Sequence, residues 1–236
     1  PAVFGWELGG LETGADRSID DVPFAEITRL LCAAYGRGAV NTVSWHPQNP
    51  ESGASAWDGK TSTAVSSILP GGANHAQFRL WLDRLAGFFV GLKSADGTCV
   101  PVLFRPFHEH TGSGFWWGEA QCTPDEYKAL WRFTVEYLRD VKGVHNLLYV
   151  YSPDLYRDAE HYTERYPGDE WVDVLGLDAY HRPQDWDFLS GGERMLSTLQ
   201  RLGHEHGKPT AFTETGLEGI PDTAWWTRRL LPVIRG

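Results

Sequence analysis

The chain has 236 residues, of which 42% are hydrophobic and 22% charged, which is enough for one domain with a large core. Its formal net charge of −10 argues against nucleic acid or an anionic membrane surface as the main partner, so a neutral ligand fits better. No run of about 18 apolar residues is present, and we therefore expect no membrane insertion. We predict a single domain over residues 1–236 that acts as a monomer.

Short apolar segments alternate along the chain with amphipathic stretches, and several of these segments are apolar throughout, as strands buried on both faces are. We predict strands over Ala2–Trp6, Ala39–Trp45, Cys99–Phe104, Asn146–Tyr151, Val172–Leu177 and Pro209–Thr213. We predict helices over Phe24–Tyr35, His75–Leu92, Pro124–Val141, Gly192–His206 and Trp225–Val233. Strands that alternate with helices in this way predict a parallel sheet.

Two architectures fit this order of elements. A (β/α)₈ TIM barrel collects its active site from loops at the carboxyl ends of the strands, where the chemically interesting residues of this chain fall. An open, doubly wound sheet would instead account for six strands without a missing part. The longest polar stretch, Gln48–Asn74, follows the second predicted strand, and a loop of that length is usually functional when it is ordered.

The cysteines give little indication of function. Cys32, Cys99 and Cys122 show no CxxC spacing, which argues against a structural zinc site. Cys99 and Cys122 could form a disulfide in an exported protein, and the alternative is three buried thiols.

Two short segments contain the residues best suited to catalysis. Arg105–Gly112 (RPFHEHTG) and Phe212–Gly216 (FTETG) each place a glutamate, Glu109 and Glu214, after a short apolar run and before a glycine turn. Two carboxylates at strand ends suit the chemistry that cleaves glycosidic bonds. The predicted function is therefore that of a carbohydrate-cleaving enzyme.

The surroundings of the two glutamates predict different roles. Arg105, Phe107 and Glu109 alternate to one side if the strand continues, and apolar neighbours would raise the pKa of Glu109, as a general acid requires. Glu214 would end a strand and act as an ionised nucleophile. Tyr180, at the end of the preceding strand, could donate a phenolic hydrogen bond to it.

Histidines and tryptophans beside these segments could bind sugar. His46 and His108 could each contact a hydroxyl or be structural. Trp116 and Trp117 could stack on pyranose rings or pack the loop, and we expect one of each. About half of the eleven tryptophans should lie in the core.

Two other classes of function remain open from these residues. His108 and His110, with His46 or Asp178, could hold a metal in a metal-dependent barrel hydrolase, although no HExxH motif is present. A non-catalytic carbohydrate-binding protein would show the same tryptophans with inactive glutamates.

The chain also resembles glycoside hydrolase family 26, whose best-known members are endo-β-1,4-mannanases. The similar segments are Pro1–Gly5, Thr42–Asn49, Ser55–Asp58, Ile68–Gly72, Arg105–Gly118, Tyr149–Asp154, Asp173–Tyr180, Phe212–Gly216 and Trp225–Pro232. The resemblance implies a retaining mechanism that needs no metal or organic cofactor, with Glu109 as acid/base and Glu214 as nucleophile. Family members place these carboxylates after strands 4 and 7 of a TIM barrel, so this chain would be a fragment that runs from strand 2 through helix 7.

The resemblance further assigns substrate contacts. Tyr180 should orient Glu214, Arg105 should hold the carboxylate geometry, His46 and His108 should contact hydroxyls, and Trp57 and Trp117 should line the cleft. Similar sequences usually carry an aromatic residue at the position of Gly114, so the resemblance implies that this chain lacks one sugar platform. The implied substrate is β-mannan, with β-1,3-xylan and mixed-linkage β-glucan as alternatives. A polymeric substrate implies a secreted, cell-surface or periplasmic enzyme.

Overall fold

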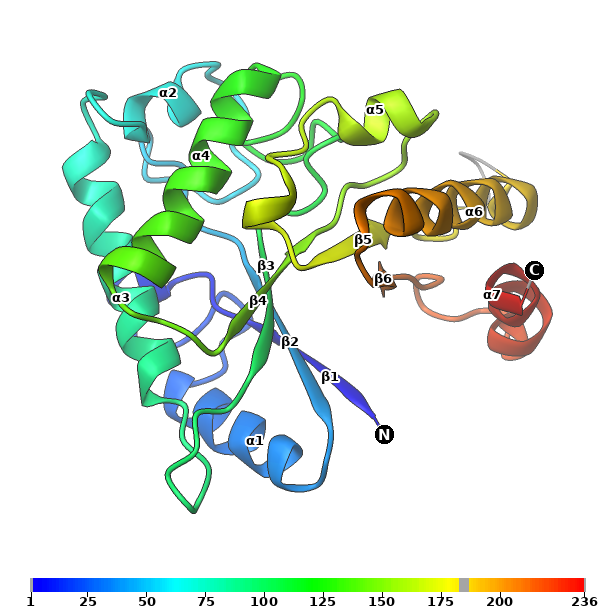
Figure 1. Cartoon of the computed structure of the whole chain (residues 1–236), viewed down its shortest axis with the longest axis horizontal. Helices are drawn as coiled ribbons and strands as arrows, with labels where there is room; N and C mark the ends of the chain where they lie inside the picture. Colours follow the sequence, from blue (N-terminus) through cyan, green and yellow to red (C-terminus); the bar gives the residue numbers. More distant parts are fainter. Residues whose placement is uncertain (1, 183–186, 236) are drawn as a thin grey trace.

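The structure is a computed structural model that describes residues 2–182 and 187–235 (Figure 1). Pro1, at the start of the first family-like segment, lies outside the described residues. Within them no helix is long and apolar enough to cross a membrane.

In the described part of the chain, six parallel strands form one sheet in the order in which they occur along the sequence. They are β1 (Val3–Glu7), β2 (Val40–Trp45), β3 (Val102–Pro106), β4 (Leu147–Tyr151), β5 (Val174–Asp178) and β6 (Thr210–Glu214). A doubly wound sheet would reverse its strand order at a switch point, and this one does not. The sheet twists strongly, with helices packed around its outer face, so the architecture is a partial TIM barrel of six strands (Figure 1).

All six predicted strands are confirmed within a few residues. The largest offset is in β3, because Lys93 and Cys99 form an antiparallel bridge that closes the preceding turn and delays the strand. The helices are α1 (Phe24–Gly36), α2 (Ala64–Ile68), α3 (His75–Gly91), α4 (Pro124–Glu136), α5 (Ala159–Thr163), α6 (Phe188–His206) and α7 (Leu231–Arg235). The short helices α2 and α5 were not predicted. A π-helical turn continues α4 to Val141, and another precedes α7 at Trp226–Leu230.

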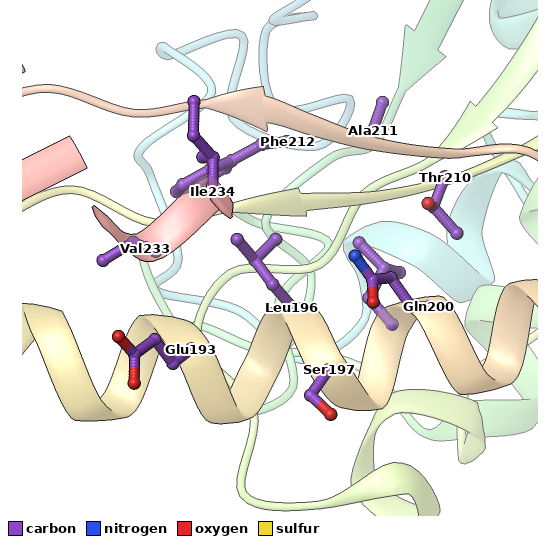
Figure 2. A pocket seen from close by; sticks show the side chains of 10 residues that line it. Glu193, Leu196, Ser197, Gln200, Thr210, Ala211, Phe212, Val233 and Ile234 are labelled. Atoms are coloured by element: carbon purple, nitrogen blue, oxygen red, sulfur yellow. The ribbon is translucent and has the colours of Figure 1, made fainter. Parts of the chain in front are cut away.

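The aromatic core lies between the sheet and its helices. Among the described tryptophans, Trp45, Trp81, Trp116, Trp117, Trp131 and Trp225 are buried, in line with the expected half, whereas Trp57 and Trp226 are exposed. A hollow lies on the outer face of β6, where side chains of α6, β6 and α7 converge, among them Leu196 and Phe212 (Figure 2).

Neither prediction for the cysteines is correct. Cys32 is half-buried, Cys99 exposed and Cys122 buried, and all three are free. Cys99 and Cys122 cannot pair because they lie at opposite ends of β3. Cys99 precedes the strand, whereas Cys122 comes just before α4 and contacts Arg165 Nη2 at 2.9 Å.

Two helix glycines provide a test of how closely α6 packs on the sheet. A Cβ at Gly203 would lie 2.4 Å from Thr210 Cγ2, whereas a Cβ at Gly87 of α3 would meet nothing within 4 Å. We expect Gly203→Ala to lower the free energy of unfolding by about 1–3 kcal/mol through overpacking. The matched control Gly87→Ala should raise it by about 0.5–1 kcal/mol, because alanine favours helix. Urea unfolding of both variants measures the difference, and stabilisation by both would contradict the packing described here.

Candidate active site

The buried guanidinium of Arg105 organises the carboxyl ends of β3, β5 and β6. Nη1 donates to Glu214 Oε1 at 2.7 Å, and Nη2 donates to Asp178 Oδ2 at 2.5 Å. Nε donates to Ser152 Oγ at 3.1 Å. The side chain is only 3% exposed, and although burial opposes the charge, Asp178 and Glu214 raise the pKa of Arg105 above its usual value. One cation thus fixes two carboxylates from neighbouring strands.

A β-bulge directs Glu214 toward this cation. Phe212 points to the outer face of β6, so simple alternation along the strand would send Glu214 outward as well. The register shifts between Leu177 and Asp178, which pair with Phe212 and Glu214 respectively. The extra residue, Thr213, therefore lines the inner hollow together with Glu214.

Each oxygen of Glu214 accepts one hydrogen bond. Oε1 accepts from Arg105, and Oε2 accepts from the phenol of Tyr180 at 2.8 Å. His108 Nε2 lies 3.9 Å from Oε1. The carboxylate is one-quarter exposed, so it is oriented by two donors and still accessible from the hollow.

Glu109 occupies a strained turn and not the end of a strand. β3 ends at Pro106, and both Phe107 and Glu109 have positive φ, 51° and 54°. The predicted alternation of Arg105, Phe107 and Glu109 is therefore wrong, because the chain leaves extended geometry and Phe107 turns into the core. Each such backbone conformation costs on the order of 1–3 kcal/mol and must be held by its surroundings.

Buried donors and acceptors hold this turn. Tyr127 OH donates to the carbonyl of Phe107 at 2.8 Å, and Trp117 Nε1 donates to the carbonyl of His108 at 2.8 Å. The amide of Glu109 donates to the carbonyl of Ser152 at 2.8 Å. These bonds fix Glu109 relative to β4, next to the strands that carry Arg105 and Asp178.

The surroundings of Glu109 favour its protonated form. Burial, followed by the negative charges of Asp178, Asp154 and Glu214, raises the pKa of Glu109 to about 8, and Arg105 only partly opposes this effect. Burial also raises the pKa of Asp154. The pKa of Glu109 is thus shifted upward, in the direction that the sequence predicted for a general acid.

His46 and His108 form one wall beside these carboxyls. Their rings meet edge to face at 4.5 Å, and the ring of Trp57 stacks on His46 at 5.2 Å with an interplanar angle of 14°. Sequence reasoning missed Glu7 at the end of β1. Its carboxylate lies 2.7 Å from His46 Nδ1 and accepts from the amide of His46 at 3.0 Å. An acidic residue directly after the first predicted strand, Ala2–Trp6, was the available signal.

An open hollow of ≈ 440 Å³ lies inside the curled sheet. His46, Trp57, Arg105 and Glu214 line it together with Glu7. Trp116 and Trp117 do not, because both are fully buried. The predictions that one of them stacks on sugar and that Trp117 lines the cleft are therefore wrong.

Both tryptophans instead support the loops around the hollow. Trp116 Nε1 donates to the carbonyl of Pro47 at 2.9 Å, and Trp117 stacks under Phe115 at 4.5 Å. A Cβ at Gly114 would meet nothing within 4 Å, so a larger side chain at this position would have room.

The structure does not bring His108 and His110 together as the alternative metal site would require. The ring of His110 is buried between Tyr127 and Tyr151, at 4.4 and 4.6 Å, whereas the ring of His108 packs on His46. The positive φ of Glu109 between the two histidines sends their rings in different directions. In the described part of the chain no three His, Cys, Asp or Glu residues are grouped as metal ligands.

A curled parallel sheet with two carboxyls in contrasting environments at its carboxyl end defines a glycosidase-like barrel. The model of glycosyl hydrolase family 26 matches residues 2–192, and the chain belongs to this family.

Relatives with known sequences or structures resemble nearly the whole chain. The mannan endo-1,4-beta-mannosidase of Bifidobacterium adolescentis is 40% identical over 93% of this chain, which corresponds to 23% of its own length. The mannan endo-1,4-beta-mannosidase of Bacillus subtilis is 34% identical over 93% of this chain, which corresponds to 59% of its own length. A GH26 beta-mannanase from Bacteroides ovatus superposes with a TM-score of 0.94 at 46% identity, covering 99% of this chain and 67% of that one. A modular endo-beta-1,4-mannanase from Cellulomonas fimi superposes with a TM-score of 0.88 at 40% identity, covering 100% of this chain and 54% of that one. The chain thus spans less than two thirds of the length of these two curated relatives.

The raised pKa of Glu109 predicts a pH-dependent effect of its replacement on stability. Between the ordinary value of 4.5 and the folded value of about 8, the folded protein holds a proton that the unfolded chain has lost, so this group makes stability fall as pH rises. Glu109→Gln removes that loss. We expect the variant to gain about 4 kcal/mol relative to the parent between pH 4.5 and pH 8.5.

Denaturant unfolding at both pH values measures this gain. The control Glu160→Gln changes an exposed glutamate of α5, whose side chain the fold does not enclose, and should show no such difference. An equal effect of Glu109→Gln at both pH values would contradict the description of a desolvated carboxyl.

Proposed function

We propose that this chain carries the catalytic centre of a retaining enzyme that hydrolyses internal β-1,4-mannosidic bonds. The observation that carries the proposal is the contrast between two carboxyls at one site. Arg105 and Tyr180 hold and orient Glu214 by hydrogen bonds, whereas burial and negative neighbours keep the proton on Glu109. Mannan as the substrate is supported by the names of the relatives.

The proposed reaction follows from the contrast between a protonated Glu109 and an oriented Glu214. Glu109 protonates the leaving glycosidic oxygen while Glu214 attacks the anomeric carbon and forms a covalent glycosyl-enzyme. Glu109, now ionised, then removes a proton from water, which releases the sugar with its original anomeric configuration. We expect the two carboxyl groups to lie about 5–5.5 Å apart, the separation of retaining enzymes.

Other residues in and beside the hollow bind and orient the sugar in this proposal. Tyr180 keeps Glu214 aimed at the anomeric carbon. The Nδ1 of His46 is engaged by Glu7, so Nε2 is the ring nitrogen offered to a hydroxyl. Trp57, 55% exposed, offers the aromatic face for a sugar ring. The reaction uses no metal or organic cofactor, and a polymeric substrate places a monomeric enzyme outside the cell or in the periplasm.

The full-length protein should release reducing sugar from linear β-mannan, and a chelator should not reduce the rate. Glu214→Ala should lower this activity by at least about 10³-fold, because the covalent intermediate is lost, while circular dichroism shows a folded protein in which Asp178 still pairs with Arg105. Release from β-1,3-xylan or mixed-linkage β-glucan alone would overturn the substrate. Appreciable activity in Glu214→Ala would overturn the mechanism.

The pH profile of kcat/KM tests the role of Glu109. Activity should fall on the alkaline side with an apparent pKa near 8, because a raised pKa keeps the acid protonated up to that point. Glu109→Gln should lower the rate by about 10²–10⁴-fold and remove this limb. Asp154→Asn removes a charge that raises the pKa, so the limb should move to lower pH. A limb that persists in Glu109→Gln would assign the titration to another group.

A further inference from the structure

The loop that follows β2 presents Trp57 to the hollow. Trp57 is 55% exposed, and its ring packs against the rings of His46 at 5.2 Å and Phe115 at 5.6 Å. An exposed aromatic ring binds sugar well only if its backbone is held in place, because ordering a mobile loop on binding would cost affinity. The contacts that hold this loop therefore matter for binding.

Asn49 lies at the centre of these contacts and is completely buried. Its side-chain Oδ1 accepts from the amides of Glu51 at 2.9 Å and Ser52 at 3.3 Å. Its Nδ2 donates to the carbonyl of Asp58 at 2.7 Å. The same side chain thus joins the start of the loop to the residue that directly follows Trp57.

The backbone of Asn49 closes the same turn. Its amide donates to the carbonyl of Ala54 at 2.8 Å, and its carbonyl accepts from the amide of Gly53 at 2.9 Å. The amide of Trp116 donates to the carbonyl of Ala56 at 3.1 Å, which fixes the loop to the buried core just before Trp57. Residues 51–55 and Trp57 are exposed, so these bonds hold a loop that otherwise largely faces solvent.

We propose that Asn49 is a positioning residue that sets the place of Trp57 and thereby the affinity of one sugar-binding position. This inference rests on the proposed function, in which Trp57 stacks on sugar. Asn49 itself does not touch substrate, since it is buried and does not line the hollow. Only an amide fits its place, because a carboxylate could accept from the two amides but could not donate to the carbonyl of Asp58.

A double-mutant cycle tests the proposal. Asn49→Ala and Asn49→Asp should each raise KM for mannohexaose, and the dissociation constant measured in the Glu214→Ala background, by about 5–10-fold, with kcat changed less than about twofold. Trp57→Ala should weaken binding at least as much. Adding Asn49→Ala to Trp57→Ala should then have almost no further effect, because the residue acts through the ring.

Thr61→Ala is the matched control. Thr61 belongs to the same loop and its hydroxyl donates to Glu51 at 2.7 Å, but this bond is exposed, so affinity should stay unchanged. Hydrogen exchange supplies a readout that needs no activity: Asn49→Ala should accelerate exchange at Gly53 and Asp58, and Thr61→Ala should not.

Three outcomes would overturn the inference. They are additive losses in the double mutant, a loss of kcat at unchanged affinity, and unchanged exchange of the loop in Asn49→Ala. Failure of the proposed function would look different, because the parent protein would then neither bind nor cleave mannohexaose while the exchange difference remained.

Discussion

A single buried guanidinium is the constraint on which the site depends. Arg105 is almost inaccessible to water, so its charge must be matched by groups that the fold brings to it, and Asp178 and Glu214 provide that match from two adjacent strands. The combined negative charge of these two carboxylates is then larger than the single positive charge of Arg105. A further carboxyl placed nearby cannot easily ionise, and this excess charge adds to the effect of burial in making Glu109 an acid.

The remaining parts of the site serve to hold groups that the backbone alone would not place correctly. A bulge in β6 brings Glu214 to the inner face, and a turn with two positive φ angles carries Glu109 away from the core. Buried tryptophans, Trp116 and Trp117, donate hydrogen bonds to loop carbonyls and so stabilise the loops on both sides of the hollow. The core aromatic residues therefore act on the chemistry indirectly.

Hydrophobic patterning predicted the strands, the main helices and the parallel order because burial on both faces of a strand leaves a clear signal in the sequence. It also pointed to Glu109, Glu214, Arg105 and Tyr180 as candidate site residues, which lie at or just beyond the carboxyl ends of such strands, and their catalytic roles stay predictions. It failed at Trp117 and at the alternation of Phe107 and Glu109, since side-chain direction there depends on a turn whose strain is offset by distant partners such as Tyr127. Glu7 was not predicted, because its role depends on contact with His46, which lies 39 residues away along the chain.

The central claim is that Glu214 becomes covalently attached to sugar while Glu109 carries the proton. The most direct measurement is to incubate the full-length protein with a 2-deoxy-2-fluoro mannoside that bears a good leaving group, and to map the modified peptide by mass spectrometry. We predict one adduct, on the peptide that contains Glu214. An adduct on Glu109, or turnover with inversion of the anomeric configuration and no adduct, would contradict the account.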